Sequence, residues 1–106
     1  MENTNHPTAS NLSQSFTVHV DESGSWLKVT IANLITLSLT ERISNASFKK
    51  GKYAYLEYPD DAYKFIRAWL TAHSCNSEDF SYFESFVTIQ NDGKFSWIKR
   101  LHHYKP

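Results

Sequence analysis

Four side chains in the C-terminal half of the chain could in principle ligate a zinc ion. His73 and Cys75 are two positions apart. His102 and His103 are adjacent near the end. Imidazole and thiolate are ligands that Zn²⁺ prefers, but neighbouring residues on a strand point to opposite faces, so His102 and His103 do not readily share one ion. No CxxC or HExxH spacing accompanies them, and we predict no metal site.

Covalent catalysis would need a nucleophile held against a base and an orienting third group. Cys75 with nearby His73 comes closest, but both lie in a polar stretch and no third partner is indicated. The glycines Gly24, Gly51 and Gly93 are isolated, which argues against a phosphate-binding loop. We therefore predict that the protein is not an enzyme and uses no cofactor.

Two acidic pairs could supply a general acid and a general base. A carboxyl group keeps its proton at neutral pH only in an apolar pocket, and neither Asp60-Asp61 nor Glu78-Asp79 lies in apolar sequence. The first pair opens a helix, where the backbone dipole favours negative charge, and the second belongs to a polar linker. Neither pair indicates catalysis.

Basic residues interleaved with aromatic ones form the best candidate for a binding surface. One group occupies the turn at residues 49–52, and the other lies in residues 93–106, which contain no acidic residue. Such groups contact protein partners or single-stranded nucleic acid, although lysines on strand edges also serve only to discourage aggregation. The predicted partner-binding residues are Lys49, Lys50, Lys52, Trp97, Lys99, Arg100 and Tyr104.

The elements that position these residues begin after a polar N-terminus. Residues 1–14 show no periodicity and are predicted to form a disordered tail, followed by one domain over residues 15–106. The alternation in SFTVHV predicts a strand that ends in a turn at residues 21–24.

The next stretch fits two structures. At period two it forms one long strand, and at helical spacing it forms a strand over 26–29 followed by a helix over 31–38, with Thr30 as a possible cap. We favour the strand and helix, although the pattern alone does not decide between them.

The second half of the chain is easier to divide. Two strands, over 44–48 and 53–58, flank the basic turn. In DDAYKFIRAWLTAH, apolar residues recur at i, i+3, i+4, i+7 and i+8, which predicts an amphipathic helix. A polar linker, SCNSEDFS, follows it.

The last segment is predicted to be a hairpin closed by Asn91-Asp92-Gly93, with Tyr82 and Phe86 on one strand. Phe95, Trp97 and Leu101 would share a face of the other strand. The resulting order is β-β-α-β-β-α-β-β, an α+β domain with two helices and a mainly antiparallel sheet. Dimerisation through the last strand is compatible with it.

The composition of the chain narrows the range of possible functions further. The chain has 106 residues, 11 basic and 11 acidic side chains, and an aromatic fraction of 15%. Zero net charge argues against a dedicated nucleic-acid binder, whose affinity comes mostly from neutralised phosphates. The aromatic content exceeds what one small core needs, which suggests that some rings lie on a surface.

The compartment is expected to be the cytoplasm. Cys75 is the single cysteine, so no internal disulfide can form, and small secreted domains usually depend on such bonds. The N-terminus lacks the basic and apolar regions of a signal peptide, and no apolar stretch approaches the roughly 18 residues of a membrane span.

Residues 24–70 contain GSWLKV, Arg42-Ile43-Ser44, Gly51, Tyr55-Leu56-Glu57 and an acidic pair before a helix that contains Phe65. This pattern resembles that of small uncharacterised proteins carried by bacterial phages, plasmids and integrated elements. This chain has Tyr58-Pro59 where the family is more acidic. The resemblance supports the short helix over 31–38 and brings no catalytic residue. It implies an accessory protein of a mobile element, a class that often blocks host defence complexes, CRISPR effectors included.

These observations predict a non-enzymatic protein that docks on a protein partner through aromatic and basic residues of the last segment. A mobile-element inhibitor of a host defence complex is the most specific form of this hypothesis. The alternative is a nucleic-acid-binding module that uses the basic turn and the basic C-terminal segment.

Overall fold

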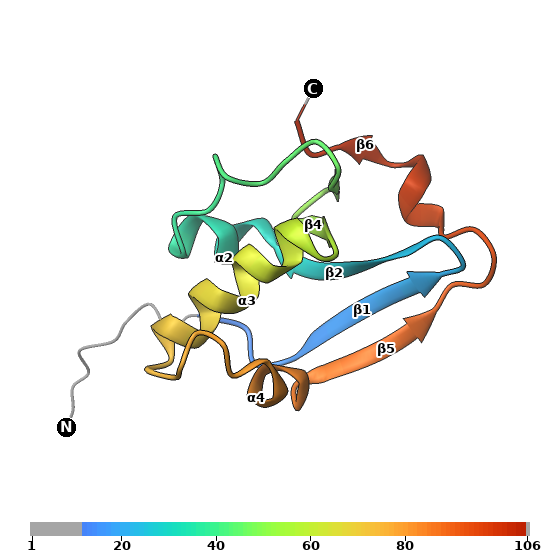
Figure 1. Ribbon diagram of the computed structural model, residues 1–106. Helices are drawn as coiled ribbons and strands as arrows, with labels where there is room; N and C mark the ends of the chain where they lie inside the picture. The colour runs from blue at the N-terminus through green and yellow to red at the C-terminus, as the bar shows by residue number, and fades with distance from the viewer. Residues whose placement is uncertain (1–11, 106) are drawn as a thin grey trace.

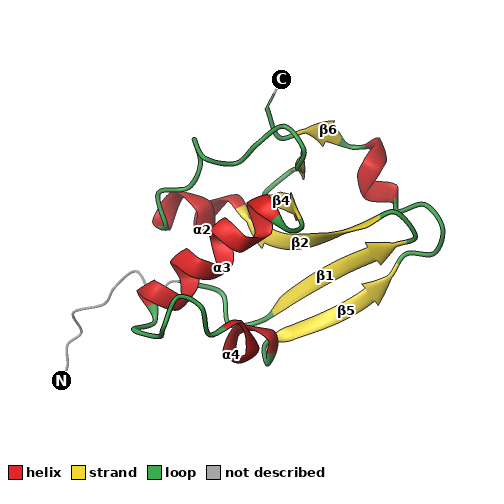
Figure 2. Cartoon of the chain, in the orientation of Figure 1, coloured by secondary structure: helices red, strands yellow, loops and turns green. Residues whose placement is uncertain are grey.

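The computed structural model describes residues 12–105, in which six strands form one sheet in the order β5-β1-β2-β4-β3-β6. Figures 1 and 2 show the sheet and the helices that lie against it. The strands are β1 (Phe16–Asp21), β2 (Gly24–Thr30), β3 (Phe48–Lys50), β4 (Tyr53–Glu57), β5 (Val87–Asn91) and β6 (His102–His103). The helices are α2 (Ile31–Thr36), α3 (Asp60–Ala72), α4 (Phe80–Glu84) and the 3₁₀ helix η1 (Trp97–Arg100).

The predicted fold class is confirmed. Neighbouring strands are antiparallel except for β1 and β5, which run parallel, so the sheet is mixed but mainly antiparallel. The described residues contain three α-helices where two were predicted, because α4 forms inside the stretch assigned to the polar linker and the following strand.

One face of the sheet, called here the helical face, carries the main core. Side chains alternate along β1, so Phe16 and Val18 point towards the helices. The ring of Phe16 lies 5.6 Å from that of Phe65, 5.9 Å from that of Trp69 and 4.8 Å from that of Phe83. These rings come from β1, α3 and α4, and their packing fixes both helices on the sheet.

The ambiguous stretch after β1 forms a strand and then a helix. The backbone N–H of Asn33 donates to the Thr30 hydroxyl over 3.1 Å, so Thr30 caps α2 as expected. Leu34 of α2 is fully buried in the core. The predicted amphipathic helix is also confirmed as α3, with its apolar stripe buried.

Asp61 has a role that its position at a helix start did not reveal. Its buried carboxylate accepts hydrogen bonds from the Ser44 and Ser47 hydroxyls, at 2.7 and 2.6 Å, and from Lys64 Nζ at 3.1 Å. The two serines belong to the stretch predicted as a strand over 44–48. Because Asp61 takes up these donors, residues 44–47 form a loop and the strand begins only at Phe48.

The predicted final hairpin is wrong. β5 pairs in parallel with β1, and the chain then passes the β1–β2 turn to reach η1 and β6 at the opposite edge of the sheet (Figure 1). Phe95, Trp97 and Leu101 therefore do not share a strand face. Tyr82 lies in α4, where its N–H donates to the Asp79 carboxylate, instead of in the expected strand.

The expected tail at residues 1–14 lies mostly outside the described residues. Leu12 is buried in the core, and the Ser13 carbonyl accepts a hydrogen bond from Trp69 Nε1 at 3.0 Å. Residues 12–14 therefore pack with the domain.

Candidate interaction surface

The C-terminal segment, residues 92–101, covers the sheet face opposite the helices, called here the C-terminal face, before the chain joins the sheet edge as β6. Ile98 is fully buried there in a second cluster with Trp26, Phe48 and Tyr55. A single aliphatic side chain thus anchors η1 over three aromatic rings that come from three different strands. The residues of the segment that flank Ile98 are left to form the surface.

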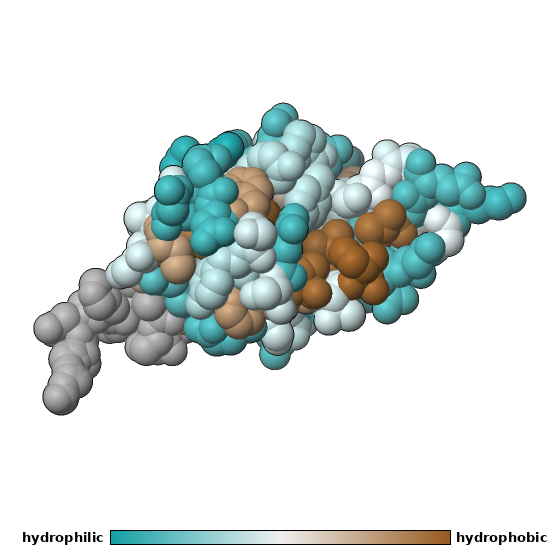
Figure 3. All heavy atoms as spheres, turned by 60° about the horizontal axis from the view of Figure 1, so that its bottom comes forward, coloured by the Kyte–Doolittle hydropathy of each residue, from teal (hydrophilic) through white to brown (hydrophobic). Residues whose placement is uncertain are grey.

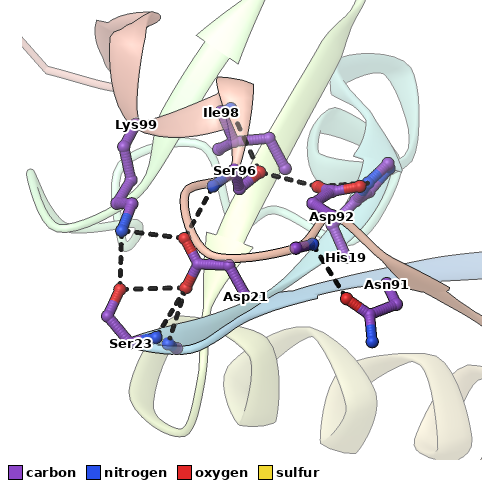
Figure 4. Close-up of polar contacts among 10 residues, drawn as sticks. His19, Asp21, Ser23, Asn91, Asp92, Ser96, Ile98 and Lys99 are labelled. Carbon is purple, nitrogen blue, oxygen red and sulfur yellow. Dashed lines mark hydrogen bonds and ion pairs between the residues drawn. The ribbon is translucent and has the colours of Figure 1, made fainter.

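Asp21 holds this segment in place (Figure 4). Its side chain is completely buried and accepts hydrogen bonds from Lys99 Nζ at 2.8 Å, the Ser96 N–H at 2.7 Å and the Ser23 hydroxyl at 2.9 Å. Burial opposes the charged form, but the hydrogen bonds from Lys99, Ser96 and Ser23 outweigh it and hold the pKa of Asp21 well below its usual range. The carboxylate at the end of β1 therefore stays ionised and binds η1 through both charge and backbone.

Asp92 makes a second connection between β1 and the segment. It lies between Nδ1 of His19, at 3.0 Å, and the Ser96 hydroxyl, which donates to it over 2.6 Å (Figure 4). These are the residue types of a serine hydrolase triad in a different order. A serine nucleophile needs its hydroxyl against the imidazole, whereas here the carboxylate separates the two. The arrangement supports a structural role for all three.

Two exposed rings lie beside this network. Phe95 and Trp97 are 53% and 42% exposed. Lys99 Nζ lies 4.1 Å and the Arg100 guanidinium carbon 5.2 Å from the centre of the Phe95 ring. The exposed ring of Trp97 meets Tyr55 edge-on at 5.3 Å, which fixes its orientation. We call Phe95, Trp97, Lys99 and Arg100 the aromatic–basic surface. It presents two aromatic rings and two cations without any acidic side chain of its own.

The structure brings together three of the seven predicted contact residues, namely Trp97, Lys99 and Arg100. Lys49 and Tyr104 are separated from them. Because Lys49 follows Phe48 on β3, its side chain points to the helical face, where it lines a groove of about 630 Å³ with Tyr104. Lys49 Nζ is 6.0 Å from the Tyr104 ring.

Lys50 and Lys52 lie nearer to the C-terminal face. Lys50 is exposed opposite Tyr53 in the β3–β4 ladder, and Lys52 Nζ lies 5.6 Å from the Tyr53 ring. Lys28, which was not predicted, places its Nζ 4.1 Å over the same ring. The sequence signal that could have identified Lys28 is the period-two alternation along β2, which puts Lys28 on the same face as Trp26. Phe95 was also omitted from the predicted set, because it was read only as part of a strand.

The histidines and the cysteine considered for zinc do not form one cluster in residues 12–105. His73 stacks on Trp69 and directs Nδ1 to the Trp69 carbonyl at 2.8 Å, while His103 stacks on Phe48. Cys75 is a half-buried free thiol. Over residues 12–105, no three His, Cys, Asp or Glu side chains are grouped so that they could hold a metal ion.

A second surface lies on the part of the helical face that α3 does not cover. Here β1 and β5 extend past the helices, and an apolar patch appears in brown in Figure 3. The groove has a volume of about 520 Å³ and is lined by Val18, Val20, Ser25, Tyr58, Glu84, Val87 and Ile89. Burial, with smaller effects from Glu84 and Tyr63, raises the pKa of Tyr58 to about 12, so its hydroxyl stays neutral. We call this the β5 groove.

Comparison of the chain with protein-family models, with curated proteins and with solved structures finds no match. Nothing in residues 12–105 forms a helix of the length and apolar character needed to cross a bilayer.

Proposed function

We propose that this protein is non-enzymatic and acts by binding another protein through the aromatic–basic surface. The observation that carries the proposal is the exposure of Phe95 and Trp97 on a segment held on β1 by the hydrogen bond from the Ser96 N–H to the buried Asp21 carboxylate and by the contact of Asp92 with His19. Large rings fixed before binding lose little conformational freedom on contact, which is why aromatic and arginine side chains dominate the binding energy of protein interfaces.

A nucleic-acid partner is the second candidate, favoured by the cations that flank Phe95. Two observations favour a protein partner over it. The charge of Lys99 is neutralised by Asp21 at 2.8 Å, and the whole chain carries no net charge. A phosphate backbone would therefore meet few free positive charges here, whereas a protein interface needs none.

A more specific proposal concerns the partner. The resemblance of residues 24–70 to proteins of mobile elements supports a cytoplasmic inhibitor that docks on a host defence complex of bacteria, such as a CRISPR effector. A half-buried free Cys75 is compatible with the reducing conditions of that compartment.

Affinity purification from a bacterial lysate, followed by titration calorimetry with the partner recovered, tests the main proposal. The Trp97→Ala, Arg100→Glu double variant is expected to lose the partner. The matched control is Tyr82→Ala, Arg42→Glu, because Tyr82 is as exposed as Trp97, at 42%, and Arg42 is also exposed. If the first variant folds normally and keeps every partner, the aromatic–basic surface is not the binding site.

A salt titration separates the two classes of partner. Binding to phosphates weakens steeply as ionic strength rises, since counterions are released on binding. We expect a shallow dependence for this protein, because its contacts are mainly aromatic. A steep dependence, together with loss of binding after nuclease treatment, would favour the nucleic-acid alternative.

A further inference from the structure

Within residues 12–105, the outer edge of β5 is open, because no other strand pairs with it. Its sequence, VTIQN, contains neither a charged residue nor a proline. Natural sheets usually protect such an edge with lysine, proline or a covering segment, because unpaired backbone groups attract another strand. The opposite edge of the sheet, by contrast, ends in the two-residue strand β6.

The backbone groups that face outwards can be identified from the ladder. Phe16 N–H donates to the Phe86 carbonyl at 2.9 Å, and Asp92 N–H donates to the Val20 carbonyl at 2.7 Å. In a parallel pair, alternate residues of one strand bond to the neighbour. The residues between these contacts, Val87, Ile89 and Asn91, therefore direct their N–H and C=O groups away from β1.

We propose that this edge binds the β5 edge of a second copy of the chain, antiparallel, with the two-fold axis at Ile89. This register pairs Ile89 with its own copy and Val87 with Asn91, so every outward-facing residue of the strand is used. About six main-chain hydrogen bonds would form, two for each such pair. A register centred on Thr88 or Gln90 leaves one outward-facing residue of each strand unpaired.

Charge complementarity supports the same register. Glu84 ends α4 just before β5 and Lys94 lies in the loop just after it, so the antiparallel arrangement places Glu84 of one copy at the end of the edge where Lys94 of the other copy lies. Both side chains are exposed, and the two-fold axis produces this opposite-charge contact twice. The chain also has no net charge that would keep two copies apart.

The β5 groove supplies the apolar part of the contact. Ile89 is 63% exposed and lines the groove together with Val87, Val18 and Val20. On the two-fold axis, the two Ile89 side chains lie opposite each other, since paired Cα atoms in this position are about 5.5 Å apart. The two grooves thus join into one, and each copy removes the other's Ile89 from water.

Analytical ultracentrifugation over a series from low to high micromolar concentration is the first test. The wild-type mass is expected to rise from 12.3 kDa to twice that value and stop there. Ile89→Lys places two like charges on the axis and should raise the dissociation constant on the order of a hundredfold. The control is Ile35→Lys, because Ile35 is 64% exposed but lies on α2; it should dimerise like the wild type.

A charge swap and hydrogen exchange test the register. Glu84→Lys and Lys94→Glu should each weaken the dimer, and the double variant should restore it. The amides of Val87, Ile89 and Asn91 should become protected from exchange as concentration rises. A monomer at every concentration, a mass that grows without limit, or equal effects of Ile89→Lys and Ile35→Lys would overturn the proposal. The edge would then be left to a strand of a different protein.

This dimer uses a surface separate from the aromatic–basic surface, so the two proposals fail separately. The Trp97→Ala, Arg100→Glu variant should dimerise normally while losing its partner. Ile89→Lys should lose the dimer and, as a folded monomer, still bind the partner.

Discussion

The two faces of the sheet are covered by different physical means. On the helical face, α3 lays an apolar stripe on β1, β2 and β4, and the contacts are rings and aliphatic chains. On the C-terminal face, a segment whose only helix is the four-residue η1 is held on β1 by the contacts of Asp21 with Ser96 and Lys99 and by the contact of Asp92 with His19. The attachment of α3 depends on the apolar area that it buries, whereas the attachment of the C-terminal segment depends on individual hydrogen bonds.

This difference explains why the rings of the candidate interface can be exposed. A segment attached by apolar burial must turn its large side chains inwards. A segment attached through Asp21, the His19–Asp92 contact and the buried side chain of Ile98 can direct Phe95 and Trp97 outwards and still hold its conformation.

Removal of the central ring on the helical face should have the largest effect on stability. Trp69 is fully buried and contacts Phe16 and Phe83. Trp69→Ala is expected to lower the free energy of unfolding by roughly 3–5 kcal/mol, measured by urea denaturation. Trp97→Ala, the matched change on the exposed surface, should cost less than about 1 kcal/mol. Equal losses would contradict the distinction between the two faces.

Removal of the Asp21 carboxylate should have a smaller and more local effect. Asp21→Ala leaves Lys99 Nζ and the Ser96 N–H without their buried acceptor, so the C-terminal segment is expected to detach while α3 stays folded. Hydrogen exchange should show lost protection at residues 96–101 and retained protection in α3. Glu22→Ala is the control, since Glu22 is exposed in the same turn. A uniform loss of protection would show that the two faces unfold together.

The same contrast decides how much of the fold could be predicted. The stripe of α3 repeats within one helix, so its burial follows from local spacing. Asp21 and Ser96 are 75 positions apart, and no local pattern indicates their contact. The spacing of Phe95, Trp97 and Leu101 fits a strand as well as it fits a loop followed by a 3₁₀ helix. The predicted hairpin failed for this reason.

The candidate site was predictable to the same limited extent. Trp97, Lys99 and Arg100 are close in sequence, so their grouping needed no knowledge of the fold. Lys49 was assigned to the same surface because its charge matched, but alternation along β3 turns it to the other face. The β5 groove was missed because it exists only once β5 lies beside β1.

Acid should weaken the attachment of the loop at residues 44–47 to α3. Burial disfavours the charge of Asp61, but hydrogen bonds from Ser47, Ser44 and Lys64 outweigh it and lower its pKa. A carboxyl group with a lowered folded pKa stabilises the protein above its unfolded pKa of about 3.9, and this stability is lost as pH falls through the folded pKa.

Thermal melting from about pH 6 to about pH 2 measures this effect. The wild type should lose stability below about pH 4. Asp61→Asn should be less stable at neutral pH and show a shallower decline, with a remaining slope from Asp21, whose pKa is also lowered. An unchanged slope in the variant would show that Asp61 does not contribute to acid sensitivity.

The smallest effect concerns an ion pair on the helical side. Arg67 Nε and Glu78 Oε2 are 2.9 Å apart, nearly the same as the 2.8 Å between Lys99 and Asp21. The side chains of the first pair are 48% and 64% exposed, whereas those of the second are 21% and 0% exposed. Water and salt screen an exposed pair, so Glu78→Gln should cost less than about 0.5 kcal/mol and nothing measurable in concentrated salt. Arg67 keeps its contact with the Phe80 ring in this variant, 5.5 Å from the ring centre, which isolates the charge effect.

Lys99→Met, measured in the same way, should lower the free energy of unfolding by more and respond less to salt, because the Asp21 side chain is not exposed to solvent. If the two changes cost the same, distance alone would set the strength of these contacts, and the burial of Asp21 would not explain how the C-terminal segment is held.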